Sequence, residues 1–321
     1  MSADSSVIAS PAPVLLPVSG LRWGFAGVVA FSFTVIFTRI AVRGLPPLFI
    51  GAGRAVVAAV LAALVLSIAT RYQPRSQSRS RPRGRQWAQL AVVAAGVVLG
   101  FPVLTSYALS EVPAGHGAVV IAILPAATAV AVVVRTGERP ARSFWVFALV
   151  GAVAAIGFAA LGSGGLGELH GADLLLFGAV VAGAVGYAEG GLLSRRLGSW
   201  QTISWALVVA APVMLALTGL SIAQQDPQAQ QITQATAGQW AAFGYLSVVS
   251  MFLGFFAWYR GLAIGPMAQV SQVQLAQPVL TLAWAALLLG ETLTAPTLAG
   301  GLAVVGCAAL AVRTRLSPSS G

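Results

Sequence analysis

The chain has 321 residues, of which 58% are hydrophobic and only 8% are charged. Soluble domains carry about 25% charged residues, so this composition excludes an ordinary soluble protein and indicates an integral membrane protein. All 18 basic residues are arginines, and the formal net charge is +10. An excess of positive charge of this size is compatible with two binding partners, nucleic acid and the anionic surface of a membrane.

Apolar segments long enough to cross a membrane follow one another along the chain. A helical span needs about 20 mostly apolar residues. The segments are continuous runs of Ala, Val, Leu and Gly, which favour helices over the alternating strands of a barrel. The sequence therefore predicts an all-α membrane protein with ten transmembrane helices, at about 21–42, 46–69, 87–109, 113–134, 144–162, 172–194, 200–222, 239–259, 266–289 and 296–312.

Two polar segments stand out at the start of the chain. Residues 1–19 are rich in Ser and Pro, and we expect a disordered tail. The arginine-rich stretch 71–85 could serve as a nucleic-acid arm, but it lies between two spans and lacks interleaved aromatic residues beyond Tyr72. We interpret it as a solvated cytoplasmic loop that fixes topology and touches anionic lipid. No nucleic-acid partner is expected.

The second half of the chain repeats the first. A shift of 153 residues places Pro113 on Pro266 and Pro125 on Pro278 without a gap. This predicts one repeat at 20–162 and another at 171–313, each with five spans. Copies that begin an odd number of spans apart lie in opposite orientations, which is typical of secondary transporters with a binding site between the halves.

The arginines orient the predicted spans. With the N-terminus in the cytoplasm, Arg43 alone falls in an outside loop and Arg39 and Arg54 lie within spans, so the other 15 of the 18 arginines are cytoplasmic. The positive-inside rule expects this asymmetry. We therefore expect a multi-pass protein of the cytoplasmic (inner) membrane with both termini inside the cell.

Several motifs recur in a specific order. They are Trp23-Gly24 opening the first span, Arg54 in the second, Pro125 and Pro278 in the fourth and ninth, and the pairs Gly137–Glu138 and Gly290–Glu291 that close those two spans. This pattern resembles the drug/metabolite transporter superfamily, EamA type. The resemblance implies a ten-helix carrier that moves a small polar metabolite, with export of amino acids or related compounds as the expected activity.

Glutamines concentrate in the ninth predicted span. At about 100° per residue, Gln269, Gln272 and Gln277 share a sector of roughly 140°. An unpaired amide in hydrocarbon costs a few kcal/mol, so this face contacts either a wet, substrate-binding cavity or polar groups of other helices. We favour the cavity and leave Gln274 open. Pro278 follows these residues, and it and Pro125 are expected to kink their helices.

Three ionisable residues in or near predicted spans are candidates for function. Glu189 is an acid within an apolar segment, which makes it either a proton-coupling group or a carboxylate that reaches water or Arg195 and Arg196. His116 aligns with Gln269 in the repeat, and histidine changes charge near neutral pH, so it is a candidate for substrate binding and proton coupling. Arg54 either bridges helices or binds a substrate carboxylate.

Aromatic residues supply candidate cavity walls, with Tyr187 and Trp258 as the first to test. Motifs for nucleotide loops and metalloprotease zinc are not found, and neither a cofactor nor a metal is expected. The alternative to a transporter is a non-transporting membrane scaffold or receptor, or a membrane-embedded enzyme. The expected partners are a small polar substrate and the lipid bilayer. A monomer and a homodimer both stay open.

Overall fold

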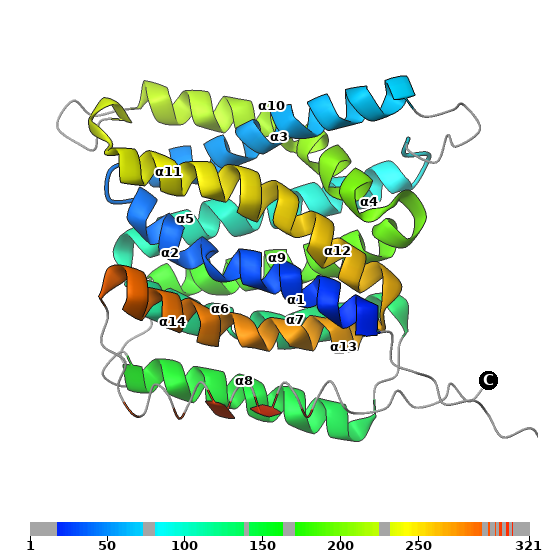
Figure 1. Cartoon of the computed structure of the whole chain (residues 1–321), viewed down its shortest axis with the longest axis vertical. Coiled ribbons are helices and arrows are strands. Elements are labelled where there is room, and N and C mark those ends of the chain that lie inside the picture. Colours follow the sequence, from blue (N-terminus) through cyan, green and yellow to red (C-terminus); the bar gives the residue numbers. More distant parts are fainter. Residues whose placement is uncertain are drawn as a thin grey trace, which may run out of the picture.

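A computed structural model describes residues 18–72, 81–137, 141–162, 171–224 and 232–290, together with isolated residues between 295 and 310. Within these ranges every regular element is helical. The helices lie side by side with their axes roughly aligned, and the chain passes back and forth along this common axis (Figure 1). The predicted all-α class is thereby confirmed for the described residues.

Six of the described helices are long and apolar enough to cross a membrane, with mean hydropathy between 1.6 and 2.3. In the first half of the chain they are α1–α2 (Val18–Ser32 and Thr34–Ala41), α3 (Pro47–Tyr72) and α4–η2–α5 (Gln86–Val93, Ala94–Gly100 and Phe101–Glu111). In the second half they are α9 (Gly171–Leu197), α10 (Ser199–Ala223) and α11–η4–α12 (Ala237–Tyr245, Leu246–Leu253 and Gly254–Ile264). These six confirm the corresponding predicted spans.

Two further predicted spans form interrupted helices. The first comprises α6 (Ala114–Ile121) and α7 (Leu124–Thr136), and the second comprises α13 (Met267–Gln272), the 3₁₀ turn η5 (Val273–Leu275) and α14 (Ala276–Leu289). Each interruption lies just before a proline, Pro125 or Pro278, whose ring nitrogen cannot donate a helical hydrogen bond. Both helices are therefore divided at equivalent places of the repeat.

The remaining described elements are α8 (Arg142–Gly162) and the short 3₁₀ turn η3 (Ile232–Gln234). Helix α8 coincides with the predicted span 144–162. The predicted span 296–312 falls mostly outside the described residues, as does the N-terminal tail predicted for 1–19.

The internal repeat is visible in the backbone. The π-helical segment η2 at Ala94–Gly100, shifted by 153 residues, falls on the π-helical segment η4 at Leu246–Leu253. Gly137 and Gly290 match in the same way, and both adopt left-handed conformations, with φ of 70° and 69°. A left-handed glycine is a common end for a helix. The repeat therefore preserves both irregular turns and helix ends.

Contacts between the two halves join equivalent helices. Helix α3 packs on α10, its counterpart in the repeat. Helix α1 packs on α12, while the counterparts of these two, α9 and the η2–α5 segment, also pack on each other. If each helix is replaced by its counterpart in the other half, these helix–helix contacts are reproduced. This pattern is expected when two halves are related by a pseudo-twofold axis.

The outer surface carries apolar stripes. On α3 and α9 the exposed large side chains recur every three or four residues, which places them along one side of each helix. They are Val57, Val60, Leu64 and Ile68 on α3 and Leu174, Phe177, Val181 and Val185 on α9. Such extended apolar surface is typical of helices that contact lipid or other helices in a membrane.

Candidate functional site

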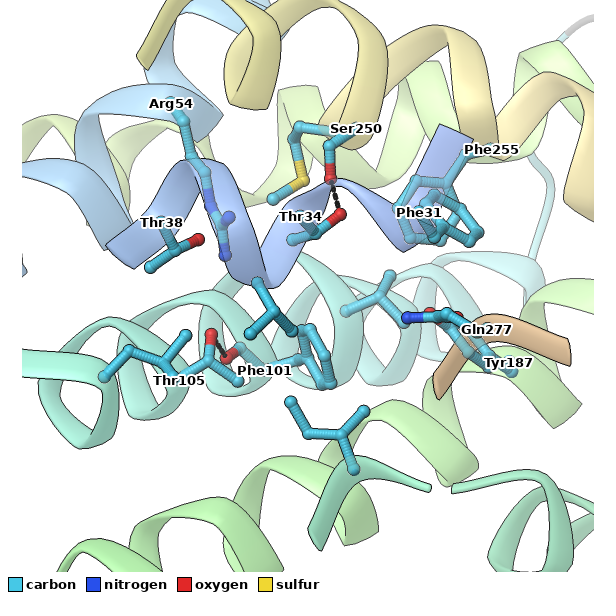
Figure 2. Close-up of a pocket in the computed structure, with 15 residues that line it drawn as sticks. Phe31, Thr34, Thr38, Arg54, Phe101, Thr105, Tyr187, Ser250, Phe255 and Gln277 are labelled. Atoms are coloured by element: carbon cyan, nitrogen blue, oxygen red, sulfur yellow. Dashed lines mark hydrogen bonds between the residues drawn. The ribbon is translucent and has the colours of Figure 1, made fainter. Parts of the chain in front are cut away.

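A central cavity lies between the two halves of the molecule, with about 520 Å³ of empty space when the open space at its mouth is included (Figure 2). Its walls come from α1, α2, α3, the η2–α5 segment and α6 of the first half, and from α9, η4, α12 and α14 of the second. The lining residues are Phe31, Thr34, Val35, Thr38, Arg54, Val97, Phe101, Thr105, Leu109, Ile121, Tyr187, Ser250, Met251, Phe255 and Gln277. A smaller pocket of about 220 Å³ shares Val35, Ile121 and Gln277 with it and extends to Pro278.

Arg54 is the charged residue in the described wall of the central cavity. Its side chain is only 1% exposed. Among the described residues, neither Nε nor Nη1 has a hydrogen-bond partner. Figure 2 shows the guanidinium reaching from α3 toward Thr34 and Thr38. Since an arginine stays protonated at neutral pH, the cavity holds a buried cation with two unused donor nitrogens.

Hydroxyl groups surround the same part of the cavity. The Thr34 and Ser250 hydroxyl oxygens lie 2.8 Å apart, which joins α2 of the first half to η4 of the second. Thr105 donates its hydroxyl proton to the Phe101 carbonyl at 2.7 Å. The Thr38 hydroxyl has no partner among the described residues. Together with Arg54, these four hydroxyl residues form what we call the polar end of the cavity.

The opposite part, the aromatic end, is formed by Phe31, Tyr187 and Phe255 with the amide of Gln277 (Figure 2). The Phe31 ring centroid lies 5.0 Å from that of Phe255 and 6.4 Å from that of Tyr187. Trp258 is fully buried with its ring centroid 5.4 Å from Tyr187, and it is not among the lining residues. Tyr187 thus lines the cavity, whereas Trp258 lies outside the lining and packs against the Tyr187 ring.

The three glutamines of the predicted polar face occupy different surroundings. Gln277 lines both pockets, and its Oε1 has no partner among the described residues. Gln272 is buried and donates through Nε2 to the Pro125 carbonyl at 3.3 Å, so it joins the two interrupted helices. Gln269 is also buried, outside both pocket linings. None of the three faces lipid.

The 3₁₀ turn separates Gln277 from the other two glutamines. A common face for all three requires an unbroken α-helix, but η5 lies between Gln272 and Gln277 and winds at 3.0 residues per turn. The extra rotation turns Gln277 toward the cavity while Gln272 stays against Pro125. Gln274, in the turn itself, borders the smaller pocket.

Two ion pairs connect the interrupted helix α6–α7 to α9. The His116 Nε2 atom lies 2.6 Å from Asp173 Oδ1 at the start of α9. Near the other end of α9, the buried carboxylate of Glu189 accepts hydrogen bonds from Arg135 at 2.6 and 3.1 Å and from the Gln89 amide. Both His116 and Glu189 lie outside the pocket linings.

The partners of the ionisable residues differ from the sequence-based expectations. Glu189 pairs with Arg135 rather than with Arg195 or Arg196, and Arg195 instead donates to the Gly265 carbonyl at 3.0 Å. Arg39 donates to the carbonyls of Leu109 and Ser110 at 2.7 and 3.2 Å. Sequence proximity suggested the wrong partner for Glu189, because α7 approaches α9 from the other half of the chain.

Sequence reasoning missed the hydroxyl groups of the polar end. Serine and threonine in a helix can bond a carbonyl three or four residues earlier, so they are tolerated at many positions of a membrane helix and give little signal. Thr34 offered one clue, because Thr34, Thr38 and Phe31 recur at helical spacing along one face of the first span.

Comparison with known proteins agrees with this architecture. The EamA-like transporter family matches residues 18–160 and 170–313, once in each half. The chain is 41% identical over 298 residues to the uncharacterized transporter YdeK of Bacillus subtilis (strain 168), covering 90% of this chain and 96% of that protein. A solved crystal structure of a protein 19% identical in sequence shares the fold with a TM-score of 0.68, covering 92% of this chain and 96% of the other.

The family match spans both halves of the molecule, and each match contains one of the two interrupted, proline-bearing helices. The resemblance expected from the sequence motifs is thereby confirmed. The chain belongs to the EamA-like transporter family and is a multi-pass membrane transporter.

Proposed function

We propose that the protein is a secondary transporter that exports amino acids or chemically related small polar metabolites by alternating access around the central cavity. The observation that carries this proposal is a cavity whose polar and aromatic ends are each built from both halves of the chain. A site at the junction of two repeats changes its exposure when one repeat moves against the other.

The proposed architecture has ten spans arranged as two inverted five-helix repeats in the cytoplasmic membrane, with both termini inside the cell. The matched irregularities of the two halves and the contacts between equivalent helices support a twofold relation. Five spans per repeat would invert the second copy relative to the first, and the distribution of arginines would place the termini inside.

Movement between the halves requires joints. The interruptions before Pro125 and Pro278, and the π-helical segments η2 and η4, offer matched places where a helix can bend. We assign substrate contact to Arg54, Tyr187 and Gln277, which line the cavity.

Other residues support the proposed cycle from outside the cavity wall. Gln269, Gln272 and Trp258 are assigned to the walls that shape the site, because all three are buried in helix contacts. His116 and Glu189 are the proposed proton-coupling groups, since their ion pairs join the first half to α9 near either end of that helix.

Cysteine labelling tests alternating access directly. The single native cysteine, Cys307, is first replaced by Ser, and single cysteines are then introduced at Tyr187, Gln272 or Gln277. We expect a membrane-impermeant thiol reagent to reach Tyr187→Cys and Gln277→Cys from either face of the membrane, depending on the state of the transporter. Gln272→Cys, buried against Pro125, should react more slowly.

Two further positions serve as controls that should not be labelled. Ala206 is fully buried and Val134 is 81% exposed on the apolar surface. Neither Ala206→Cys nor Val134→Cys should react with the impermeant reagent, because one is packed and the other faces lipid. Lack of labelling at all three test positions from both sides would favour a scaffold or receptor over a transporter.

A further inference from the structure

We infer that the substrate of the central cavity is an organic monocarboxylate without a free ammonium group, and that Arg54 binds its carboxylate. This inference rests on the proposed transport function and narrows its substrate class from amino acids and related metabolites to the related metabolites that lack a free ammonium group. The substrate's apolar portion lies at the aromatic end, among Phe31, Tyr187 and Phe255.

The first argument is the unpaired charge of Arg54. A buried cation without a partner is strongly unfavourable, and buried charges in proteins are usually paired. None of the acidic side chains among the described residues pairs with Arg54. Asp173 pairs with His116, Glu189 pairs with Arg135, and Glu111 lies exposed at the end of α5. The missing counter-charge of Arg54 is therefore supplied by the substrate.

The second argument is the geometry of the donors. A guanidinium binds a carboxylate through two parallel N–H bonds on one edge, either from Nε with Nη2 or from Nη1 with Nη2. The Nε and Nη1 atoms of Arg54 have no partner among the described residues, so each of these edges keeps a free donor. The Thr38 hydroxyl beside them is also unpaired there. A carboxylate at this point accepts hydrogen bonds from one edge of the Arg54 guanidinium and from the Thr38 hydroxyl.

The third argument excludes a zwitterion. In an α-amino acid the ammonium group is attached to the carbon next to the carboxylate, so it would lie close to Arg54. None of the described residues that line the cavity is an acid that could balance this second positive charge. A monoanion leaves the occupied site neutral, whereas a zwitterion leaves the charge of Arg54 uncompensated.

The remaining space defines the rest of the molecule. The aromatic end accepts an apolar or aromatic group, and the unpaired Oε1 of Gln277 accepts a hydrogen bond from a neutral donor such as an amide N–H. Amino acids whose nitrogen is acylated combine a carboxylate with such a neutral, partly apolar body that keeps an N–H donor. They are the class of compound that fits both ends.

Four compounds with one skeleton test the inference. N-acetylphenylalanine is a monoanion, phenylalanine is a zwitterion, phenylalaninamide is a cation and N-acetylphenylalaninamide is neutral. Their binding to the purified full-length protein in nanodiscs is measured by tryptophan fluorescence and by thermal stabilisation. We expect the monoanion to bind about tenfold more tightly, or better, than each of the other three, since only it brings a carboxylate to the buried Arg54 without adding a second positive charge.

Variants then locate the charge preference. Arg54→Gln should bind the anion and the neutral amide equally, because the residue that distinguishes them is gone. Arg54→Lys should keep a reduced preference for the anion, since it keeps the charge but loses the fork. Arg39→Gln is the matched control: Arg39 does not line the cavity and, among the described residues, bonds only the backbone carbonyls of Leu109 and Ser110, so its replacement should leave the preference unchanged.

The outcomes separate this inference from the transport function. Binding of phenylalanine as tight as that of the monoanion, or an Arg54→Gln variant that keeps the preference for the anion, would overturn the inference. Failure of all four compounds to bind the wild-type protein would also overturn it. Each of these results leaves transport standing if the cavity cysteines are labelled from both faces, while a cavity sealed from both faces removes the transport function itself. Binding of the neutral amide to Arg54→Gln shows that this variant is folded.

Discussion

Arg135 on α7 and Glu189 on α9 form an ion pair between the two halves of the transporter, with Nε 2.6 Å from Oε2. The carboxylate is buried, while the Arg135 side chain is 53% exposed. Near the other end of α9, His116 and Asp173 form a second pair. Helix α9 is thus connected to the interrupted helix α6–α7 on both sides of the break before Pro125.

Removal of Arg135 should destabilise the protein more than neutralisation of Glu189. Arg135→Gln leaves a buried carboxylate with the Gln89 amide as its partner, whereas Glu189→Gln keeps the shape and removes the charge. We expect a loss of about 1–3 kcal/mol for Arg135→Gln and less for Glu189→Gln. Unfolding of the solubilised protein in increasing sodium dodecyl sulfate measures both. A larger loss for Glu189→Gln would show that the pair itself, rather than the stranded charge, determines stability.

Transport should depend on pH through His116. His116 Nε2 lies 2.6 Å from Asp173 Oδ1, and we propose this contact between α6 and α9 as a place where a proton is taken up and released. Flux into proteoliposomes is measured with and without a pH gradient, for the wild type and for His116→Gln. We expect the gradient to change the wild-type rate and to affect His116→Gln less. Identical rates with and without the gradient in the wild type would remove proton coupling from the account.

The hydroxyl pair Thr34–Ser250 should couple the two halves. Thr34→Val and Ser250→Ala each remove one side of a buried bond 2.8 Å long. Hydrogen bonds between membrane helices are worth about 1 kcal/mol or less. A double-mutant cycle on unfolding should give a coupling free energy of about 0.5–1 kcal/mol. Strictly additive losses would indicate that the two hydroxyls do not stabilise each other.

Gly261 should be intolerant of a side chain. A Cβ atom there would lie 2.6 Å from the backbone nitrogen of Gly24 and 2.8 Å from the Gly20 carbonyl oxygen, where α12 crosses α1. Small residues allow such close approach in membranes. We expect Gly261→Ala to lower stability by about 1–3 kcal/mol through overpacking. Gly244→Ala is the control, since a Cβ at Gly244 meets nothing within 4 Å. Equal stability of the two variants would contradict the crossing.

The spans could be predicted from the sequence because their apolar length is a physical requirement of the bilayer. The prolines were also informative, since Pro125 and Pro278 mark the places where two helices are interrupted. The π-helical segments were not predictable. Residues such as Ala94–Gly100 have the same apolar composition as the α-helix around them, and only tertiary packing selects the wider turn.

The candidate site was predicted in part. A charge or an amide in an apolar span is conspicuous, so Arg54 and Gln277 could be found, and both line the cavity. Their neighbours Thr38 and Ser250 could not, because hydroxyls are inexpensive in membrane helices. The contact between Arg135 and Glu189 joins residues 54 positions apart, a separation that no local pattern reveals.

We propose that the two like halves of the transporter lie in opposite orientations around the cavity. Reporter fusions that are active on only one side of the membrane test it most directly when placed at residue 167, between the repeats, and at residue 320, after the second repeat. If the halves are inverted, the fusion at 167 reports an external location and the fusion at 320 a cytoplasmic one. If both fusions report the same side, the halves are not inverted and alternating access around their junction is contradicted.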